Sequence, residues 1–240
     1  MKIRLDRLLV ERGLTESREK AQALIMAGEV LVGGQKALKP GQSVADDCTV
    51  EILARPPFVS RGGLKLAAAL RHFAVNVAGK ICLDVGASTG GFTDALLGAG
   101  AARVHAVDVG AGQLDWKLRS DPRVVIHDRV NARHLDFAEI GELVDFIACD
   151  VSFISVTVIL PALAPLLRTD GQMIILVKPQ FEVGKGQVGK GGIVRDPAAH
   201  EAACARVAEA TRRLGFATAI MESPILGKEG NKEFLLHAQR

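Results

Sequence analysis

From residue 81 onward the chain contains five short apolar runs, separated by segments with helical periodicity. The runs are residues 81–85, 104–107, 124–126, 146–149 and 173–177. Apolar residues, many of them Val and Ile, occupy successive positions, so both faces of each strand must be buried. Strands of this kind, joined through helices, form a parallel sheet covered on both sides. The sequence therefore predicts a doubly wound α/β fold, closed by a hairpin of residues 216–221 and 233–237.

Residues 1–53 have another pattern, which predicts a small α+β module. Apolar residues recur at helical spacing up to Ile25, with Gly13 ending a first helix and Thr15 or Ser17 beginning a second. Short strand patterns and a Gly33-Gly34 turn follow.

A proline pair separates the two patterns. Residues 54–59 include Pro56-Pro57, which continues neither a helix nor a strand and stiffens the connection. We expect a module over residues 1–53, a linker over 54–59 and a larger domain over 60–240.

Composition excludes several protein classes. With 48% hydrophobic and 24% charged residues, the chain is an ordinary globular protein rather than a disordered one or a coiled coil. The net charge of +3 is too small to demonstrate a polyanionic partner by itself. The four cysteines include no C-x-x-C pair, so we expect no disulfide framework, no metal site and a reducing, cytoplasmic location.

No segment has the character of a membrane anchor. The N-terminus mixes charges with leucine, so we expect no signal peptide. The longest apolar stretch, residues 156–167, contains two prolines and is too short for a bilayer, so it predicts a core helix.

A glycine-rich turn, DVGASTGGFT over residues 84–93, follows the first strand. Glycines allow a sharp turn and close approach of a ligand at the carboxyl end of a strand, where doubly wound sheets bind cofactors. The G-x-x-x-G-G spacing argues against a dinucleotide site and resembles motif I of S-adenosylmethionine (SAM)-dependent methyltransferases. Asp84 can favour the cationic methionine end of SAM, and Asp108, which closes the second strand, can accept both ribose hydroxyls.

Further cofactor contacts are implied by the same resemblance. Asp128 or Asn131 would read the adenine amino edge, although both residue types also favour turns for local reasons. The candidate cofactor-binding residues are Ser60, Asp84, Gly86, Ser88, Gly90, Gly91, Phe92, Asp108, Asp128 and Asn131.

A second glycine-rich run, residues 184–190, matches G-x-x-x-x-G-K. Gly191 stands where a phosphate-binding loop needs Ser or Thr, and the run follows the fifth strand instead of the first. We interpret it as a mobile loop that covers the substrate, with an ordinary flexible loop as the alternative.

Four charged residues are candidates for catalysis. Asp150 and Lys178 each close an apolar strand, where an unpaired charge is costly. Lys65 and Glu233 complete a set that we expect to converge above one sheet edge.

This ordered set resembles the FtsJ type of ribose 2′-O-methyltransferase, whose catalytic residues are Lys, Asp, Lys and Glu. The N-terminal module resembles the S4 RNA-binding domain, through motifs such as Arg4-Leu5-Asp6, Ser17-Arg18 and Lys39-Pro40-Gly41. The combination is similar to the TlyA (haemolysin A) family. The resemblance implies a Rossmann-like sheet, SAM as cofactor, and methylation of cytidine in ribosomal RNA or a ribosomal subunit. We expect no membrane partner, because the sequence has no signal peptide, spanning helix or basic amphipathic segment.

The chemistry suggests a role for each of the four residues. A ribose hydroxyl is a poor nucleophile, and a lysine can take its proton only when the amine is partly neutral, which desolvation and a second cation favour. We expect Lys178 to be the general base and Lys65 to steady the developing alkoxide. Asp150 and Glu233 would hold the two amines in position without a metal.

The S4 resemblance implies a helical face that contacts RNA phosphate. Its cations are Arg4, Arg7, Arg18 and Lys20. An ordinary solvated surface remains the alternative, because the first 60 residues are nearly neutral.

Three other functions remain as alternatives. A nucleobase amino-methyltransferase typically has two prolines and an aromatic residue after the acidic position, whereas Val151-Ser152-Phe153 follows Asp150 here. A membrane-lytic toxin lacks support in the sequence. An assembly factor with a vestigial fold would not need intact Asp84, Asp108, Lys65 and Lys178. The short tail ending at Arg240 favours large-subunit RNA as the target, and the oligomeric state stays open.

Overall fold

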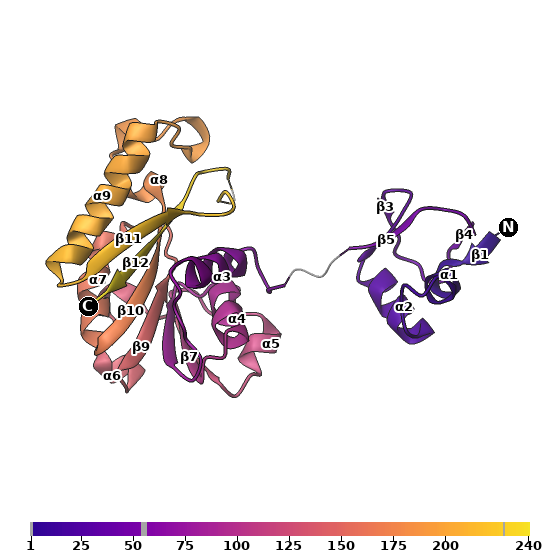
Figure 1. Ribbon diagram of the computed structural model, residues 1–240, viewed down its shortest axis with the longest axis horizontal. Helices are drawn as coiled ribbons and strands as arrows, with labels where there is room; N and C mark the ends of the chain where they lie inside the picture. The colour runs from indigo at the N-terminus through magenta and orange to yellow at the C-terminus, as the bar shows by residue number, and fades with distance from the viewer. Residues whose placement is uncertain (1, 54–56, 228) are drawn as a thin grey trace. The chain divides into compact units, whose positions relative to one another are not determined.

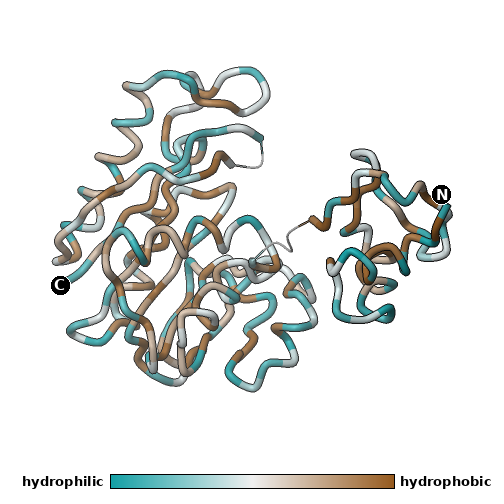
Figure 2. Tube along the Cα trace, turned by 45° about the vertical axis from the view of Figure 1, so that its right-hand side comes forward, coloured by the Kyte–Doolittle hydropathy of each residue, from teal (hydrophilic) through white to brown (hydrophobic). Residues whose placement is uncertain are grey.

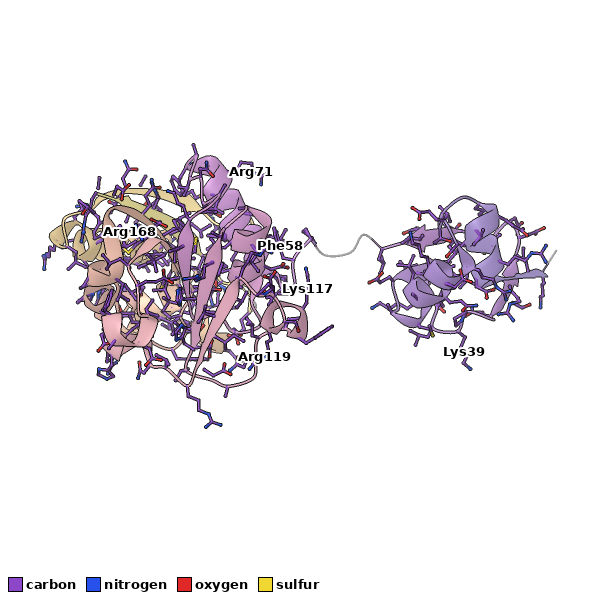
Figure 3. All side chains as sticks on the ribbon, turned by 90° about the horizontal axis from the view of Figure 1, so that it is seen from below. Lys39, Phe58, Arg71, Lys117, Arg119 and Arg168 are labelled. Carbon is purple, nitrogen blue, oxygen red and sulfur yellow. The ribbon has the colours of Figure 1, made fainter. Side chains whose placement is uncertain are left out.

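The computed structural model describes residues 2–53, 57–227 and 229–240. The chain forms two compact units, Met1–Pro56 and Pro57–Arg240, each with its own core (Figure 1). Residues 54–56 of the expected linker lie outside the described residues. The last two residues of that linker, Phe58 and Val59, pack against the core of the larger unit; Phe58 is labelled in Figure 3.

The smaller unit is the α+β module that the sequence predicts. Its elements are β1 (Lys2–Arg4), α1 (Leu5–Glu11), α2 (Arg18–Met26), β2 (Val30–Val32), β3 (Gln35–Lys36), β4 (Ser43–Ala45) and β5 (Val50–Ile52). The sequence did not predict β1, which pairs antiparallel with β4, while β2 pairs antiparallel with β3 and β5.

Local sequence explains how this unit turns. Ser17 rather than Thr15 caps α2, because its hydroxyl accepts a hydrogen bond from the Lys20 N–H at 3.2 Å. Gly33 and Gly34 both have positive φ, 56° and 78°, as a tight hairpin turn between twisted strands requires.

The larger unit contains a seven-stranded sheet that confirms the doubly wound fold. Its strands lie in the order β11-β12-β10-β9-β6-β7-β8. Pairings among β6 to β10 are parallel, and β12 pairs antiparallel with both β10 and β11, which confirms the closing antiparallel pair. The strands are β6 (Ile81–Val85), β7 (Arg103–Asp108), β8 (Val124–Asp128), β9 (Val144–Cys149), β10 (Leu167–Val177), β11 (Ala217–Glu222) and β12 (Phe234–Gln239).

Both faces of the sheet are apolar and covered by helices. In β6, Cys82 belongs to the core on one face with α3 (Gly62–His72) and α4 (Gly91–Gly98). Leu83 and Val85 belong to the core on the other face, with α7 (Leu160–Leu163) and α9 (Pro197–Arg213). Figure 2 shows apolar (brown) segments gathered in the interior of the larger unit. Burial on both faces explains why the strands have continuous apolar runs.

Shorter helices occupy the connections. They are α5 (Trp116–Arg119), η1 (Ala132–His134), α6 (Phe137–Ile140), α8 (Pro179–Glu182), η4 (Lys185–Gln187) and η5 (Lys190–Gly192).

The single core helix expected over residues 156–167 was wrong. The chain there forms three short pieces, η2 (Val156–Val158), α7 and η3 (Ala164–Leu166), and Leu167 already begins β10. Pro161 and Pro165 lack an N–H and stand in the first turn of α7 and of η3, so each starts a new helix rather than extending the previous one.

No helix within the described ranges is long and apolar enough to cross a bilayer. All four cysteines lie in these ranges and are free thiols.

Candidate active site

A pocket of about 980 Å³ lies where β6 and β9 end, in the larger unit. These neighbouring strands mark the point at which the chain order in the sheet reverses, the usual ligand position in doubly wound folds. Nine of the predicted site residues line this pocket. They are Ser60, Lys65, Gly86, Ser88, Gly91, Phe92, Asp150, Lys178 and Glu233.

The glycine turn after β6 is shaped by contacts that exclude side chains. Gly86 has φ +84°, and a Cβ there would overlap the carbonyl oxygen of Asp150. A Cβ on Gly91 would overlap the Ser60 hydroxyl. Ser88, which is not a glycine, also has positive φ, 48°, a strained conformation of the kind that gathers at ligand sites. Gly86, Ser88 and Gly91 line the pocket, so the backbone of this turn borders the place where the sequence predicts cofactor binding.

Asp84 lies beneath this turn and is fully buried. Thr93 donates a hydrogen bond from its hydroxyl to Asp84 Oδ2 at 2.6 Å, while Oδ1 has no partner among the described residues. Burial raises the pKa of Asp84 to about 7. Asp84 supports the turn without lining the pocket.

Asp108, at the end of β7, binds the backbone of the glycine turn at Ser88. Its Oδ2 accepts from the Ser88 N–H at 2.8 Å, and its Oδ1 accepts from the Gly110 N–H at 2.7 Å. The carboxylate thus ties the glycine turn to the loop after β7, outside the pocket lining.

The remaining predicted cofactor residues also lie outside the lining. Asp128 pairs with Arg119 at 3.3 Å, and Asn131 caps η1 by accepting from the Arg133 N–H at 3.0 Å. Gly90 precedes α4 with φ +97°. Each therefore has a structural task at its own position.

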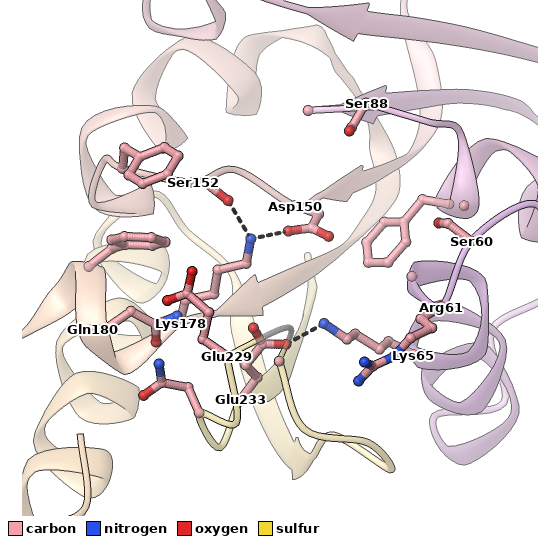
Figure 4. A pocket seen from close by; sticks show the side chains of 18 of the residues that line it. Ser60, Arg61, Lys65, Ser88, Asp150, Ser152, Lys178, Gln180, Glu229 and Glu233 are labelled. Atoms are coloured by element: carbon pink, nitrogen blue, oxygen red, sulfur yellow. Dashed lines mark hydrogen bonds and ion pairs between the residues drawn. The ribbon is translucent and has the colours of Figure 1, made fainter. Parts of the chain in front are cut away.

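The four candidate catalytic residues form two ion pairs that line the same pocket (Figure 4). Lys65 from α3 pairs with Glu233, which precedes β12. Lys178 Nζ lies 2.6 Å from Asp150 Oδ1. Segments far apart in the chain thus bring each lysine to a carboxylate.

The sequence analysis did not single out several other pocket residues. Ser152 accepts a hydrogen bond from Lys178 Nζ at 2.8 Å. Arg61 donates to the Leu226 carbonyl at 2.6 Å. Gln180 lines the wall, and its amide oxygen is buried without a partner in the described part of the chain. Their closeness in sequence to Asp150, Lys65 and Lys178 was the available signal.

Two aromatic residues also line the pocket. Phe153 is 92% exposed and has φ +64°, and its ring centroid lies 5.4 Å from that of Phe181. A large apolar side chain this exposed, held in a strained backbone conformation, indicates a site rather than a core position.

The glycine-rich run at residues 184–190 reaches the pocket through Val188, and Gly192 follows it there. Asn231, which is buried, accepts from the Val194 N–H at 2.9 Å and donates to the Gly192 carbonyl at 2.9 Å. This amide anchors the C-terminal end of the loop near Glu233.

The four cations predicted to contact RNA are all paired with acids in the smaller unit. Arg4 and Arg18 both bind Asp6 at 2.9 Å, and the hydrogen bond from Arg4 holds the pKa of Asp6 well below its usual range. Arg4 is the last residue of β1, so the expectation that it lies on a helical face was wrong.

The other two cations lie on the helices. Arg7 pairs with Glu11 at 2.7 Å, and Lys20 pairs with Glu16. Both pairs are exposed and separated by four residues. Such pairs are weak and leave the cations available to another anion.

No group of three His, Cys, Asp or Glu side chains in the described ranges is placed to hold a metal ion.

The sheet order, the glycine turn and the lysine–carboxylate pairs define a SAM-dependent methyltransferase. The FtsJ-like methyltransferase family profile matches residues 58–240, and the S4 domain profile matches residues 3–47. The chain belongs to the TlyA family.

Individual relatives support this assignment. The chain is 49% identical to the 16S/23S rRNA (cytidine-2′-O)-methyltransferase TlyA of Mycobacterium tuberculosis, covering 97% of this chain and 88% of that protein. It is 34% identical to the 23S rRNA (cytidine-2′-O)-methyltransferase TlyA of Campylobacter jejuni, covering 95% and 96%. A solved structure of a hemolysin-named protein from Streptococcus thermophilus aligns with a TM-score of 0.76 and 44% identity, covering 100% and 88%.

Proposed function

We propose that this enzyme transfers a methyl group from SAM to the ribose 2′-hydroxyl of a cytidine in ribosomal RNA. The observation that carries the proposal is the pair of lysine–carboxylate contacts, Lys65–Glu233 and Lys178–Asp150, in one pocket beside the glycine turn. The names of the M. tuberculosis and C. jejuni relatives support cytidine as the target. Both names include 23S rRNA, which favours large-subunit RNA, and we infer that the enzyme acts in the cytoplasm with that RNA.

Residues of the glycine turn fit the cofactor. SAM, when bound, supplies an electrophilic methyl group on a sulfonium ion. Gly86 and Gly91 line the pocket where the cofactor would lie, and their missing Cβ atoms let the turn pack closely on Asp150 and Ser60. The carboxylate of Asp108, whose oxygens each accept one backbone N–H, is the acceptor suited to ribose hydroxyls. Asp84 Oδ1 is buried without a hydrogen-bond partner among the described residues, and a cationic ligand on the turn would favour the ionised form of this carboxyl group.

Lys178 is the general base in this proposal. The neutral amine of Lys178 would donate its two hydrogens to Asp150 and Ser152 and keep its lone pair for the substrate. It would take the proton of the 2′-hydroxyl as the oxygen bonds to the methyl carbon, while the methyl–sulfur bond of SAM breaks and S-adenosylhomocysteine leaves. Lys65, held by Glu233, stabilises the negative charge that develops on that oxygen.

The S4 module supplies RNA affinity in this proposal. Arg7 and Lys20 are exposed cations whose pairs with Glu11 and Glu16 can be exchanged for phosphate contacts.

Single-turnover methyl transfer at saturating SAM and ribosomal RNA tests the base. Lys178→Ala should bind both substrates and lose about 10²- to 10⁴-fold in rate. Lys178→Arg should not recover the rate, because arginine has essentially no neutral form to accept a proton. Near wild-type turnover in Lys178→Arg would refute the base assignment. Nuclease digestion of the product would show methyl on ribose, whereas methyl on a base would establish the amino-methyltransferase alternative.

A further inference from the structure

Glu182 is a buried carboxylate that the proposed mechanism does not use. It ends α8, four positions after Lys178, and is 4% exposed. No cationic side chain among the described residues forms an ion pair with it; Arg206 contacts only its backbone carbonyl, at 3.0 Å. A carboxylate buried without a cation is costly, so its hydrogen bonds need an explanation.

Both carboxylate oxygens of Glu182 bind the segment that follows β9. The Ser155 hydroxyl donates to Oε2 at 2.6 Å, and the Val156 N–H donates to Oε1 at 2.8 Å. Ser155 also caps η2 by accepting from the Thr157 N–H at 3.3 Å. Glu182 therefore joins the start of η2 to the helix that follows β10.

Each of the two segments that Glu182 joins contributes to the contact of Lys178 with Asp150 and Ser152. Lys178 directly precedes α8, the helix that contains Glu182. Asp150 and Ser152 lie in the stretch between β9 and η2, which is neither helix nor strand. Phe153, in the same stretch, has φ +64°, a conformation that needs support from its surroundings. The hydrogen bonds of Ser155 and Val156 to Glu182, together with packing of Ile154 on the core, hold the chain directly after it.

We propose that Glu182 is a positioning residue: its carboxylate fixes the segment after β9 so that Asp150 and Ser152 meet the amine of Lys178. This inference rests on the proposed function, in which the orientation of Lys178 limits the rate. Misplacing a reacting group by about 1 Å can cost on the order of 10²-fold in rate.

The choice of glutamate follows from the two donors. The Val156 N–H can only donate, and the Ser155 hydroxyl donates here as well, so both oxygens must accept. Glutamine at position 182 keeps the shape and one acceptor, and Ser155 can turn its hydroxyl to accept from the amide. Alanine removes both contacts.

The test is a double-mutant cycle on the single-turnover rate of the full-length enzyme at saturating SAM and ribosomal RNA. We expect Glu182→Ala to lose about 10- to 100-fold and Glu182→Gln to keep a good part of the rate. Ser155→Ala should lose less than Glu182→Ala, and adding it to Glu182→Ala should cause no further loss, because the shared contact is already gone. Glu201→Ala, an exposed glutamate on α9, is the matched control and should behave as wild type.

Two parallel measurements separate positioning from folding. SAM affinity of Glu182→Gln and Ser155→Ala should stay close to that of wild type, and so should the thermal unfolding midpoint of Glu182→Gln. Ser155→Ala removes a hydrogen bond to a buried charge and should lower its midpoint by roughly 3–12 °C while the folded variant still binds SAM. Independent losses in the cycle, an unchanged rate in Glu182→Ala, or a rate loss that only follows loss of SAM binding would each overturn the inference. Failure of the proposed function gives another result, since the wild-type enzyme would then leave ribose unmethylated.

Discussion

Lys65 and Glu233 form the more deeply buried of the two active-site ion pairs. Their side chains are 10% and 4% exposed, against 11% and 23% for Lys178 and Asp150. Removing one partner of a buried pair leaves an uncompensated charge and costs about 3–5 kcal/mol, whereas replacing both with apolar side chains of similar volume is often neutral or stabilising. We therefore expect Lys65→Met and Glu233→Met each to destabilise the larger unit by about 3–5 kcal/mol.

The double variant Lys65→Met/Glu233→Met should recover most of that stability. For a domain of this size, each single variant should lower the unfolding midpoint by roughly 6–20 °C, and the double variant should lie near wild type. All three should be inactive in methyl transfer, because the amine of Lys65 is absent or unpositioned. The double variant would then have nearly wild-type stability without activity, which shows that this ion pair serves the reaction rather than the fold.

Urea unfolding followed by far-ultraviolet circular dichroism, without SAM, measures these differences. Lys232, next in sequence to Glu233, forms an exposed pair with Glu222, in which the side chains are 50% and 55% exposed. Lys232→Met is thus a matched control that should cost no more than about 1 kcal/mol. A double variant as unstable as the single ones, or single variants as mild as the control, would refute the buried-pair reasoning.

Three further predictions concern the cofactor turn and the S4 module. Asp108→Ala should weaken SAM affinity tenfold or more in calorimetry, since hydrogen bonds to a charge contribute about 1.5–3 kcal/mol, and unchanged affinity would exclude a cofactor role. Because burial raises the folded-state pKa of Asp84 from 3.8 to about 7, its contribution to stability is present below pH 3.8 and is lost as pH rises to 7. The free energy of unfolding of the wild type should therefore fall by about 4 kcal/mol between pH 3.8 and pH 7 through Asp84, measured by urea unfolding without SAM. Asp84→Asn should lack this fall, and an equal fall in the variant would contradict the raised pKa of Asp84. Arg7→Gln/Lys20→Gln should weaken RNA binding and flatten its salt dependence without lowering stability. The same changes at Arg4 and Arg18 would also destabilise the module, because buried Asp6 would lose both ion pairs and keep its hydrogen bond from Gln22, so they cannot isolate RNA contact.

The sequence by itself determined the sheet and the chemical content of the site. Strands buried on both faces must be apolar throughout, so the continuous runs identified β6, β7, β9 and β10 without any tertiary information. The run at residues 124–126 also marked a strand, but β8 lies at the edge of the sheet and is only partly buried, contrary to the expectation from its sequence. Polar residues that interrupt such runs stand at strand ends, which is why Asp150 and Lys178 could be named in advance. Parallel strands end at one edge, and this placed both residues in one pocket.

Only the tertiary structure decided which of these groups meet. The pairing of Lys65 with Glu233 joins residues 168 positions apart, and it depends on where α3 lies relative to β12. The tie between Glu182 and Ser155 likewise requires β9 and β10 to be neighbours in the sheet. Side-chain pairing follows spatial neighbourhood, which hydrophobic periodicity does not encode. Periodicity records which face of each element is buried and leaves open which other element covers it.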